Sequence, residues 1–140
     1  MEYRTAVEAD LPLLAELNRQ LIQDEGHPNP MSVAELESRM RAWLARAYTA
    51  IVFTREEVVV GYALYRTDNV GIFLRQFYVD RDERRKGLGR AAMEILFRRV
   101  WPHGAMVSLE ALCTNRAAID FWHALGFEDY ALTLRRRIPD

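Results

Sequence analysis

The sequence has little cysteine, few histidines and no long apolar run, and each shortage excludes a class of protein. A single cysteine, Cys113, excludes an intramolecular disulfide and a zinc site built from several cysteines. His27, His103 and His123 lie too far apart to form a local ligand motif, so we expect no metal. No eighteen apolar residues run together and no apolar run follows positive charge, so we expect no membrane span, no signal peptide and a cytoplasmic location.

The formal net charge is only -1, which argues against a nucleic-acid or membrane-surface partner. The charge is nevertheless uneven along the chain. Residues 1–70 carry seven basic and eleven acidic side chains, whereas residues 71–140 carry twelve and nine. With 140 residues and no repeat or Gly/Ser linker, we expect a single domain over residues 1–140.

The hydrophobic periodicity predicts an α/β fold. After a short first strand, Asp10 as N-cap and Pro12 in the first turn predict a helix to about Gln23. Ser32 and Glu35 form a capping box that predicts a second helix. Five strands are then expected at 48–54, 58–66, 72–79, 105–111 and 130–138, with helices before Trp101 and over 115–125.

One loop has the composition of a phosphate-binding site. A strand ending at Val79 is followed by the charged segment 80–86, by Gly87 and Gly89, and at once by a helix. Glycines let the backbone approach an anion, and the amides and dipole of a helix N-terminus favour one. A solvated loop would have the same composition, and the segment has neither the Gly-Lys-Ser/Thr ending of a P-loop nor the third glycine of a dinucleotide fingerprint.

Two segments resemble the two signatures of the GCN5-related N-acetyltransferases, the GNAT superfamily. VDRDERRKGLGRAAMEIL, residues 79–96, resembles the acetyl-coenzyme A signature, and NRAAIDFWHALGF, residues 115–127, resembles the second signature, N-x-x-A-x-x-F-Y-x-x-x-G-F. The resemblance covers essentially the whole chain. It implies a mixed, mostly antiparallel sheet of about six to seven strands, flanked by four helices and splayed open between the strand ending at Val79 and the strand containing Leu109.

The resemblance also implies acetyl-CoA as cosubstrate, bound in that opening. Its pyrophosphate would bind the backbone amides of the loop, and its pantetheine arm would pair with the preceding strand. Asn115 matches the residue that helps to position the arm, and Trp122 stands where the family has a tyrosine. The implied cofactor-binding residues are Phe77, Tyr78, Val79, Arg84, Arg85, Lys86, Gly87, Leu88, Gly89, Arg90, Asn115 and Trp122.

Acetyl transfer to an amine needs a base. An amine with a pKa of about 10.4 is free base in only about one part in 2,500 at pH 7. The resemblance makes Glu110 the first candidate, because some members have a glutamate with this role in a Leu-Glu-Val sequence before the asparagine. An ordinary exposed strand glutamate would look the same, and Tyr78 acting through a water, or His27, are the alternatives.

The acid of the family is usually the tyrosine that Trp122 replaces here. An indole N–H can donate a hydrogen bond but cannot give up a proton. A water, Cys113, His123 or another tyrosine could protonate the thiolate, or it could leave with hydrogen bonds alone. We expect Cys113 to be a small buried side chain and His123 to lie on the surface.

In the family, the first two helices and the loop between them largely set acceptor specificity. Here Asp24, Glu25 and His27 stand in that region, and we hypothesise that the acidic pair attracts a cationic amine of a small molecule, protein or peptide. A helix-terminating loop would look the same. The rival hypothesis is a module that binds acetyl-CoA without turnover. It stays open because Trp122 replaces the tyrosine that usually acts as the acid in the family. Dimerisation through the last strands is common in the family, so a homodimer also stays open.

Overall fold

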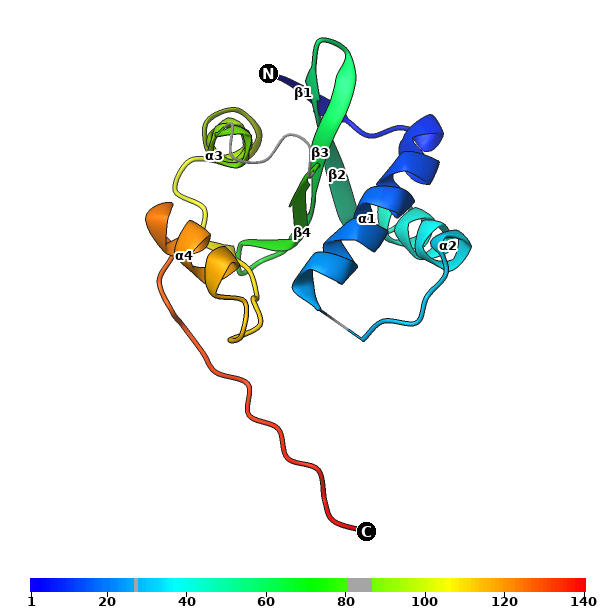
Figure 1. The fold of residues 1–140 in the computed structure, drawn as a ribbon. Helices are drawn as coiled ribbons and strands as arrows, with labels where there is room; N and C mark the ends of the chain where they lie inside the picture. The colour runs from blue at the N-terminus through cyan, green and yellow to red at the C-terminus, as the bar shows by residue number, and fades with distance from the viewer. Residues whose placement is uncertain (27, 81–86) are drawn as a thin grey trace. The chain divides into compact units, whose positions relative to one another are not determined.

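The computed structural model describes residues 1–26, 28–80 and 87–140. These residues fall into two compact units, Met1–Glu110 and Ala111–Asp140, each of which is treated by itself. The order of helices and strands is drawn in Figure 1. That residues 1–140 make one acetyltransferase domain stays a prediction.

The first unit begins with a strand, β1 (Glu2–Thr5), and a 3-10 turn, η1 (Glu8–Asp10), that leads into helix α1 (Leu11–Glu25). The predicted start of α1 after Asp10 is confirmed, but the Asp10 side chain does not cap this helix. Its carboxylate instead accepts bonds from the Val7 amide at 2.6 Å and from the Arg4 guanidinium at 2.8 and 2.9 Å. Because η1 precedes α1 in the chain and ends at Asp10, this side chain stabilises the turn η1 rather than the start of α1.

Helix α2 (Val33–Leu44) begins at the predicted capping box. The Ser32 hydroxyl accepts from the Glu35 amide at 3.2 Å, and the Glu35 carboxylate accepts from the Ser32 amide at 3.0 Å. Each bond satisfies a backbone donor that a helix end would otherwise leave without a partner.

The first unit contains one mixed sheet of five strands in the order β1-β2-β3-β4-β5. Strands β2 (Tyr48–Arg55), β3 (Val58–Thr67) and β4 (Ile72–Val79) pair antiparallel, and β5 (Val107–Ser108) pairs parallel with β4. The predicted hairpin and the predicted third strand are confirmed. The strand expected over 105–111 is shorter than predicted, and five strands replace the expected six to seven in the part of the chain that the structure describes.

The two faces of the sheet are covered by different helices. Helices α1 and α2 pack on the face that carries Tyr62, Leu64 and Tyr78, and this face forms the main core cluster with Leu14 and Met40. Helix α3 (Leu88–Ile95) and the π-helical turn η3 (Leu96–Val100) supply buried side chains to the first unit as well. Trp101, which follows them, packs edge to face on Tyr65 at 5.5 Å between ring centroids. In the register, Tyr65 lies on the face opposite Tyr62 and Leu64, so α3 lies behind the sheet as seen from α1 (Figure 1).

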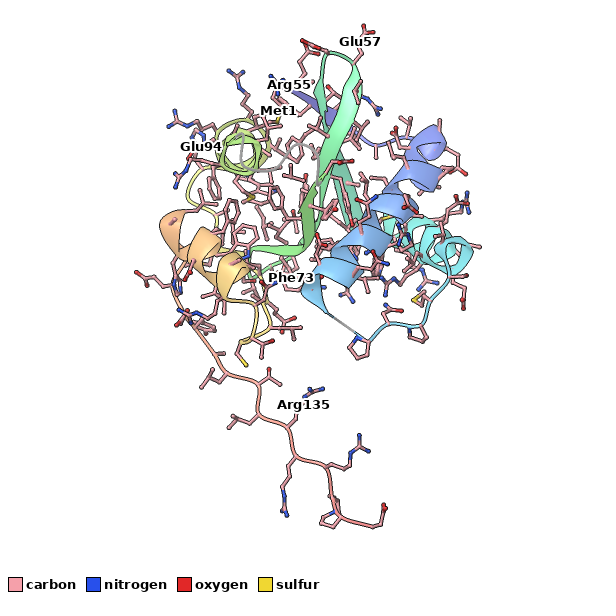
Figure 2. The ribbon with its side chains drawn as sticks, viewed as in Figure 1. Met1, Arg55, Glu57, Phe73, Glu94 and Arg135 are labelled. Atoms are coloured by element: carbon pink, nitrogen blue, oxygen red, sulfur yellow. The ribbon has the colours of Figure 1, made fainter. Side chains whose placement is uncertain are left out.

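The second unit contains helix α4 (Arg116–Ala124), as predicted from residues 115–125, followed by a tail. The prediction of a last strand over 130–138 is wrong: residues 128–140 form no strand or helix. Tyr130, Leu132 and Leu134 are 100%, 84% and 88% exposed, and Figure 2 labels Arg135 on this tail. The alternation of apolar residues is real, but a strand also requires a neighbour to take its backbone hydrogen bonds.

Among the described residues, no helix combines the length and the apolar character that crossing a membrane requires.

Candidate active site

Strands β4 and β5 pair over only two residues each. The pairs are Ile72 with Val107 and Phe73 with Ser108. Strand β5 ends there, whereas β4 continues to Val79. The pairing therefore stops at the sheet edge where the sequence predicts the opening.

A β-bulge at Arg75 follows directly after these pairs. Leu74 is opposite Tyr65 and Gln76 is opposite Leu64, so Arg75 is an extra residue in β4. A bulge bends its strand and shifts the alternation of side chains by one position. As a result Phe77 joins the face of Phe53, at 6.4 Å between ring centroids, while Gln76 and Tyr78 turn to the face covered by α1.

Tyr78, an alternative candidate for the base, is buried in the core beneath α1. Only 2% of the residue is exposed, and its hydroxyl donates to Oε1 of Gln20 at 2.8 Å. Phe77 and Val79, its neighbours in the predicted cofactor-binding strand, are half-buried.

The described part of the predicted phosphate loop is the N-terminus of α3. Gly87 is its N-cap with φ of 74°, and this residue has no side chain to cap the helix. A Cβ at Gly87 would meet nothing within 4 Å among the described residues. Leu88 and Gly89 are half-buried and Arg90 is exposed. A helix start of this kind suits a phosphate. Arg84, Arg85 and Lys86 lie outside the described residues.

Glu110 is exposed and lies two residues beyond Ser108, the last paired residue of β5. Arg75 lies two residues beyond Phe73, the last residue of β4 that pairs with β5. Both residues therefore follow closely on the last pair between the two strands. Within the described residues no hydrogen bond or ion pair holds the Glu110 carboxylate, which is exposed to solvent.

The predicted acceptor residues lie at the end of α1. Asp24 is exposed and Glu25 is half-buried, whereas His27 lies outside the described residues. Burial raises the pKa of the Tyr62 hydroxyl well above its usual value, the charge of Glu25 raises it further, and Arg39 lowers it. The charges of Glu25 and Arg39 thus shift the pKa of the same hydroxyl in opposite directions.

The residues predicted in the second unit are held by contacts within that unit. The Asn115 side chain caps α4 by accepting from the Ala118 amide at 3.3 Å. Trp122 packs edge to face against Phe121 and Phe127, with ring centroids 4.9 and 5.4 Å away.

The two side chains weighed as alternative acids are both exposed. His123 lies on the surface as predicted, with Nε2 at 2.7 Å from an Asp129 carboxylate oxygen. The expectation that Cys113 is buried is wrong, because its loop precedes α4 and no element covers it within the second unit.

Sequence reasoning missed a polar group between α1, α2 and β4. Asn18 is fully buried, and its Oδ1 accepts from Nη2 of Arg39 at 3.2 Å. The Tyr62 hydroxyl donates to Oε1 of Gln76 at 2.8 Å. The adjacent polar residues Arg75 and Gln76 interrupt an otherwise apolar strand, and this interruption is the signal that could have indicated the bulge.

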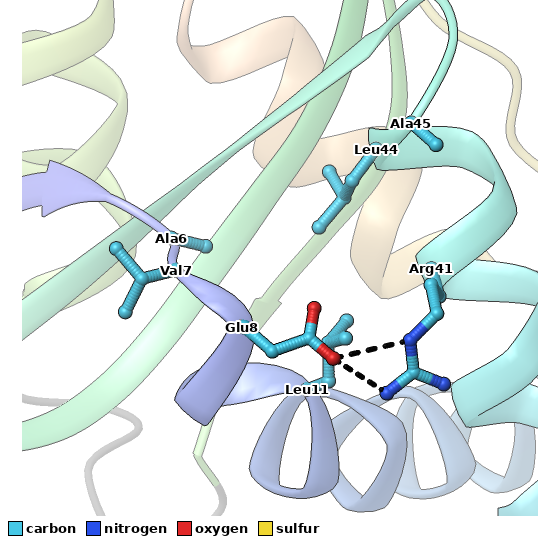
Figure 3. A pocket seen from close by; sticks show the side chains of 7 residues that line it. All are labelled: Ala6, Val7, Glu8, Leu11, Arg41, Leu44 and Ala45. Carbon is cyan, nitrogen blue, oxygen red and sulfur yellow. Dashed lines mark hydrogen bonds and ion pairs between the residues drawn. The ribbon is translucent and has the colours of Figure 1, made fainter.

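A separate surface hollow contains none of the candidate residues. In Figure 3 the Glu8 carboxylate and the Arg41 guanidinium face each other across it, at 2.9 Å. This ion pair links η1 to α2 and accounts for the polar groups there. The hollow is lined by Ala6, Val7, Glu8, Leu11, Arg41, Leu44 and Ala45.

Comparison with known proteins gives a family and a fold. The family model described as "Acetyltransferase (GNAT) family" matches residues 14–127. The search of curated proteins gave no match.

Solved structures of the same fold cover nearly the whole chain. A mutant of the BH1408 protein from Bacillus halodurans has a TM-score of 0.82 at 22% identity, over 99% of this chain and 100% of its own. The aminoglycoside N-acetyltransferase AAC(6')-Iy, in complex with CoA, has a TM-score of 0.74 at 20% identity, over 98% and 93%. The ribosomal-protein-S18-alanine N-acetyltransferase from Escherichia coli has a TM-score of 0.75 at 24% identity, over 93% and 79%. At these identities the likeness shows the fold alone.

Proposed function

Because the chain belongs to the GNAT family of acetyltransferases, we propose that it transfers an acetyl group from acetyl-CoA to a primary amine by direct attack. The observation that carries the proposal is the parting of β4 from β5, with the glycine-capped helix α3 as the next described element after β4, within the matched residues. The amine belongs to a small molecule or to a protein or peptide. Two proteins of the same fold acetylate substrates of these two kinds, an aminoglycoside and a ribosomal-protein alanine.

Acetyl-CoA supplies the acetyl group as a thioester. The backbone of residues 77–79 would hold its pantetheine arm, and the loop from Arg84 to Arg90 would hold its pyrophosphate. The positive φ of Gly87 at the N-cap of α3 supports this, because a backbone without a Cβ can approach phosphate oxygens. Removing the charges of Arg84 and Lys86 together should weaken acetyl-CoA binding, and an unaltered affinity would contradict the assignment of the loop.

Glu110 is the proposed base. Its exposed carboxylate stands where the strands part, and it takes the proton that the acceptor ammonium must lose before it attacks. Tyr78 is less suited because its hydroxyl is buried and donates to Gln20. As the amine nitrogen bonds to the acetyl carbon, the C–S bond breaks and CoA leaves as a thiolate. On the evidence of the resemblance, Asn115 is proposed to position the arm, and Trp122 to donate a hydrogen bond to that thiolate without giving up a proton.

The acidic end of α1 is proposed to draw the ammonium group toward the site before reaction. Asp24 and Glu25 lie there, and His27 follows them in sequence. Opposite charges within about a Debye length attract each other, so this contribution should weaken as salt is added.

The test is Glu110→Gln, assayed by thiol release from acetyl-CoA with a panel of amines. We expect kcat to fall by about 10²–10⁴-fold, the usual contribution of general acid–base catalysis, with a smaller change in acetyl-CoA affinity. Glu2→Gln, on an exposed glutamate of β1, is the control and should keep full activity. An unchanged pH–rate profile in Glu110→Gln would remove Glu110 from the mechanism. No amine-dependent thiol release from the native protein would favour the binding module.

A further inference from the structure

Three arginines gather over aromatic rings at the beginning of β4. Arg39, Arg66 and Arg75, called here the arginine cluster, come from α2, β3 and β4. Arg39 and Arg75 lie over Trp43, with 4.5 and 4.7 Å from the guanidinium carbon to the ring centroid. Because both lie over one ring, the two guanidinium groups can be no farther apart than about twice that distance.

The third arginine, Arg66, is linked to Arg75 by a tyrosine. The Tyr48 hydroxyl accepts from Arg66 at 2.6 Å and from Arg75 at 3.3 Å. Arg66 also lies over Phe73, at 4.7 Å from its ring centroid. Phe73, labelled in Figure 2, pairs with Ser108 of β5, so the cluster borders the point where β4 and β5 part.

The cluster has too little negative charge to balance it. Asp68, at 3.7 Å from Arg66, is the one carboxylate within ion-pair distance of the cluster in the described residues. Arg39 and Arg75 have none there. Burial lowers the pKa of Arg39, and the charge of Arg75 lowers it further. Arg39 is half-buried and Arg75 is exposed, and their like charges repel each other, which is unfavourable until an anion joins them.

Two buried donors beside the cluster have no acceptor. Asn18 is 0% exposed, and its Nδ2 has no hydrogen-bond partner among the described residues. The same is true of the buried Nε of Arg39. Buried donors normally have partners, since leaving one without an acceptor costs about 1–3 kcal/mol. Such donors next to surplus positive charge suit the oxygens of an anionic group.

The charges around the cluster are arranged for an amine that is also an acid. The negative charge of Glu25 raises the pKa of the Tyr62 hydroxyl and the positive charge of Arg39 lowers it, so a negative and a positive group both lie near this side chain. Glu110, the proposed base, follows β5 just beyond its last pair with β4, and Arg75 lies just beyond the same pair on β4. An acceptor could therefore present its amine to Glu110 and its carboxylate to the arginines.

We propose that the acceptor is a small amine bearing a carboxylate, which Arg39 and Arg75 bind with the help of Asn18. This inference rests on the proposed acetyl transfer. A guanidinium offers five donors in a fixed fork that matches a carboxylate, and a stacked arginine is already held in place for it. The rings of Trp43 and Phe73 form an apolar border for the rest of the acceptor.

The test compares amino acids with the same molecules lacking the carboxylate, such as tyrosine with tyramine and lysine with cadaverine. The native enzyme should prefer the acid in kcat/KM by at least about tenfold, the equivalent of 1.4 kcal/mol. Arg39→Gln and Arg75→Gln should each raise KM for the acid by a similar factor, with kcat and the rate on the decarboxylated amine little changed. Arg39→Lys, which keeps the charge and loses the fork, should fall between.

Arg98→Gln is the matched control, because Arg98 is an exposed arginine whose one ion pair among the described residues is with Glu94 of α3. It should keep the preference for the acid. Thermal melts and acetyl-CoA titration of every variant separate unfolding from loss of acceptor binding. An equal preference for acid and amine in the native enzyme, or a preference that survives in both glutamine variants, overturns the inference.

Titration of the same amino acids and of their N-acetyl products separates this inference from the proposed function. If no amine supports thiol release but these carboxylates bind the native protein and bind the glutamine variants more weakly, acetyl transfer fails and the carboxylate site stands. If amines are acetylated and no carboxylate ligand discriminates between native and variant proteins, the reverse holds.

Discussion

Tyr78→Phe separates the two candidate bases that lie in the described first unit. Phenylalanine keeps the ring in the core cluster and removes only the hydroxyl that donates to Gln20 at 2.8 Å. If Glu110 is the base, this change should affect stability and leave kcat near the native value. If Tyr78 moves protons, kcat should fall by about 10²–10⁴-fold.

The size of the stability change follows from the surroundings of that hydroxyl. A hydrogen bond between neutral groups contributes about 0.5–1.5 kcal/mol net. Gln20 is half-buried, so its amide oxygen can turn to water and adds little further cost. We therefore expect a loss of about 1 kcal/mol in the free energy of unfolding, or about 3–5 °C in Tm for a chain of this size.

Urea melts and steady-state thiol-release kinetics on the same preparation measure both effects. Tyr62→Phe is the matched control: Tyr62 is also buried, and its hydroxyl donates to Gln76 at 2.8 Å. Both variants should lose similar stability and keep similar kcat. A folded Tyr78→Phe protein whose kcat drops a hundredfold while Tyr62→Phe stays active would refute the assignment to Glu110.

Two further predictions concern stability. Glu56 and Glu57 form the two-residue turn of the β2–β3 hairpin with φ of 52° and 67°, a conformation that favours Asn-Gly (Figure 2 labels Glu57). Replacing them by Asn and Gly should therefore raise the free energy of unfolding by about 1–2 kcal/mol with unchanged activity, and a lower Tm would contradict the strain. The hydrogen bond from Arg4 lowers the pKa of Asp10, so the unfolded chain takes up that proton first and stability is lost as the pH falls through the lowered value. Asp10→Asn should destabilise the protein at pH 7 and much less at about pH 3 in urea melts, and an equal effect at both pH values would exclude the ion pair as the cause.

Local patterns accounted for the elements that local interactions stabilise. The capping box at Ser32 requires residues three positions apart, and both of its bonds form. Strand β4 begins and ends where the periodicity places it, at Ile72 and Val79. The prediction of a strand in the tail was wrong because local alternation specifies only which side chains share a face. A strand forms only with a neighbour that takes its hydrogen bonds.

The sequence by itself determined the family, the order of the first helices and strands, and a helix at the glycine pair Gly87 and Gly89, because each follows from residues near one another in the chain. Only the tertiary structure placed the bulge at Arg75, buried Tyr78 beneath α1, and assembled the arginine cluster around Trp43. Arg39 and Arg75 are distant in sequence, and neither has a pattern that names the other as a neighbour. Their proximity comes from α2 packing on one face of a sheet whose bulged strand turns an exposed arginine toward it.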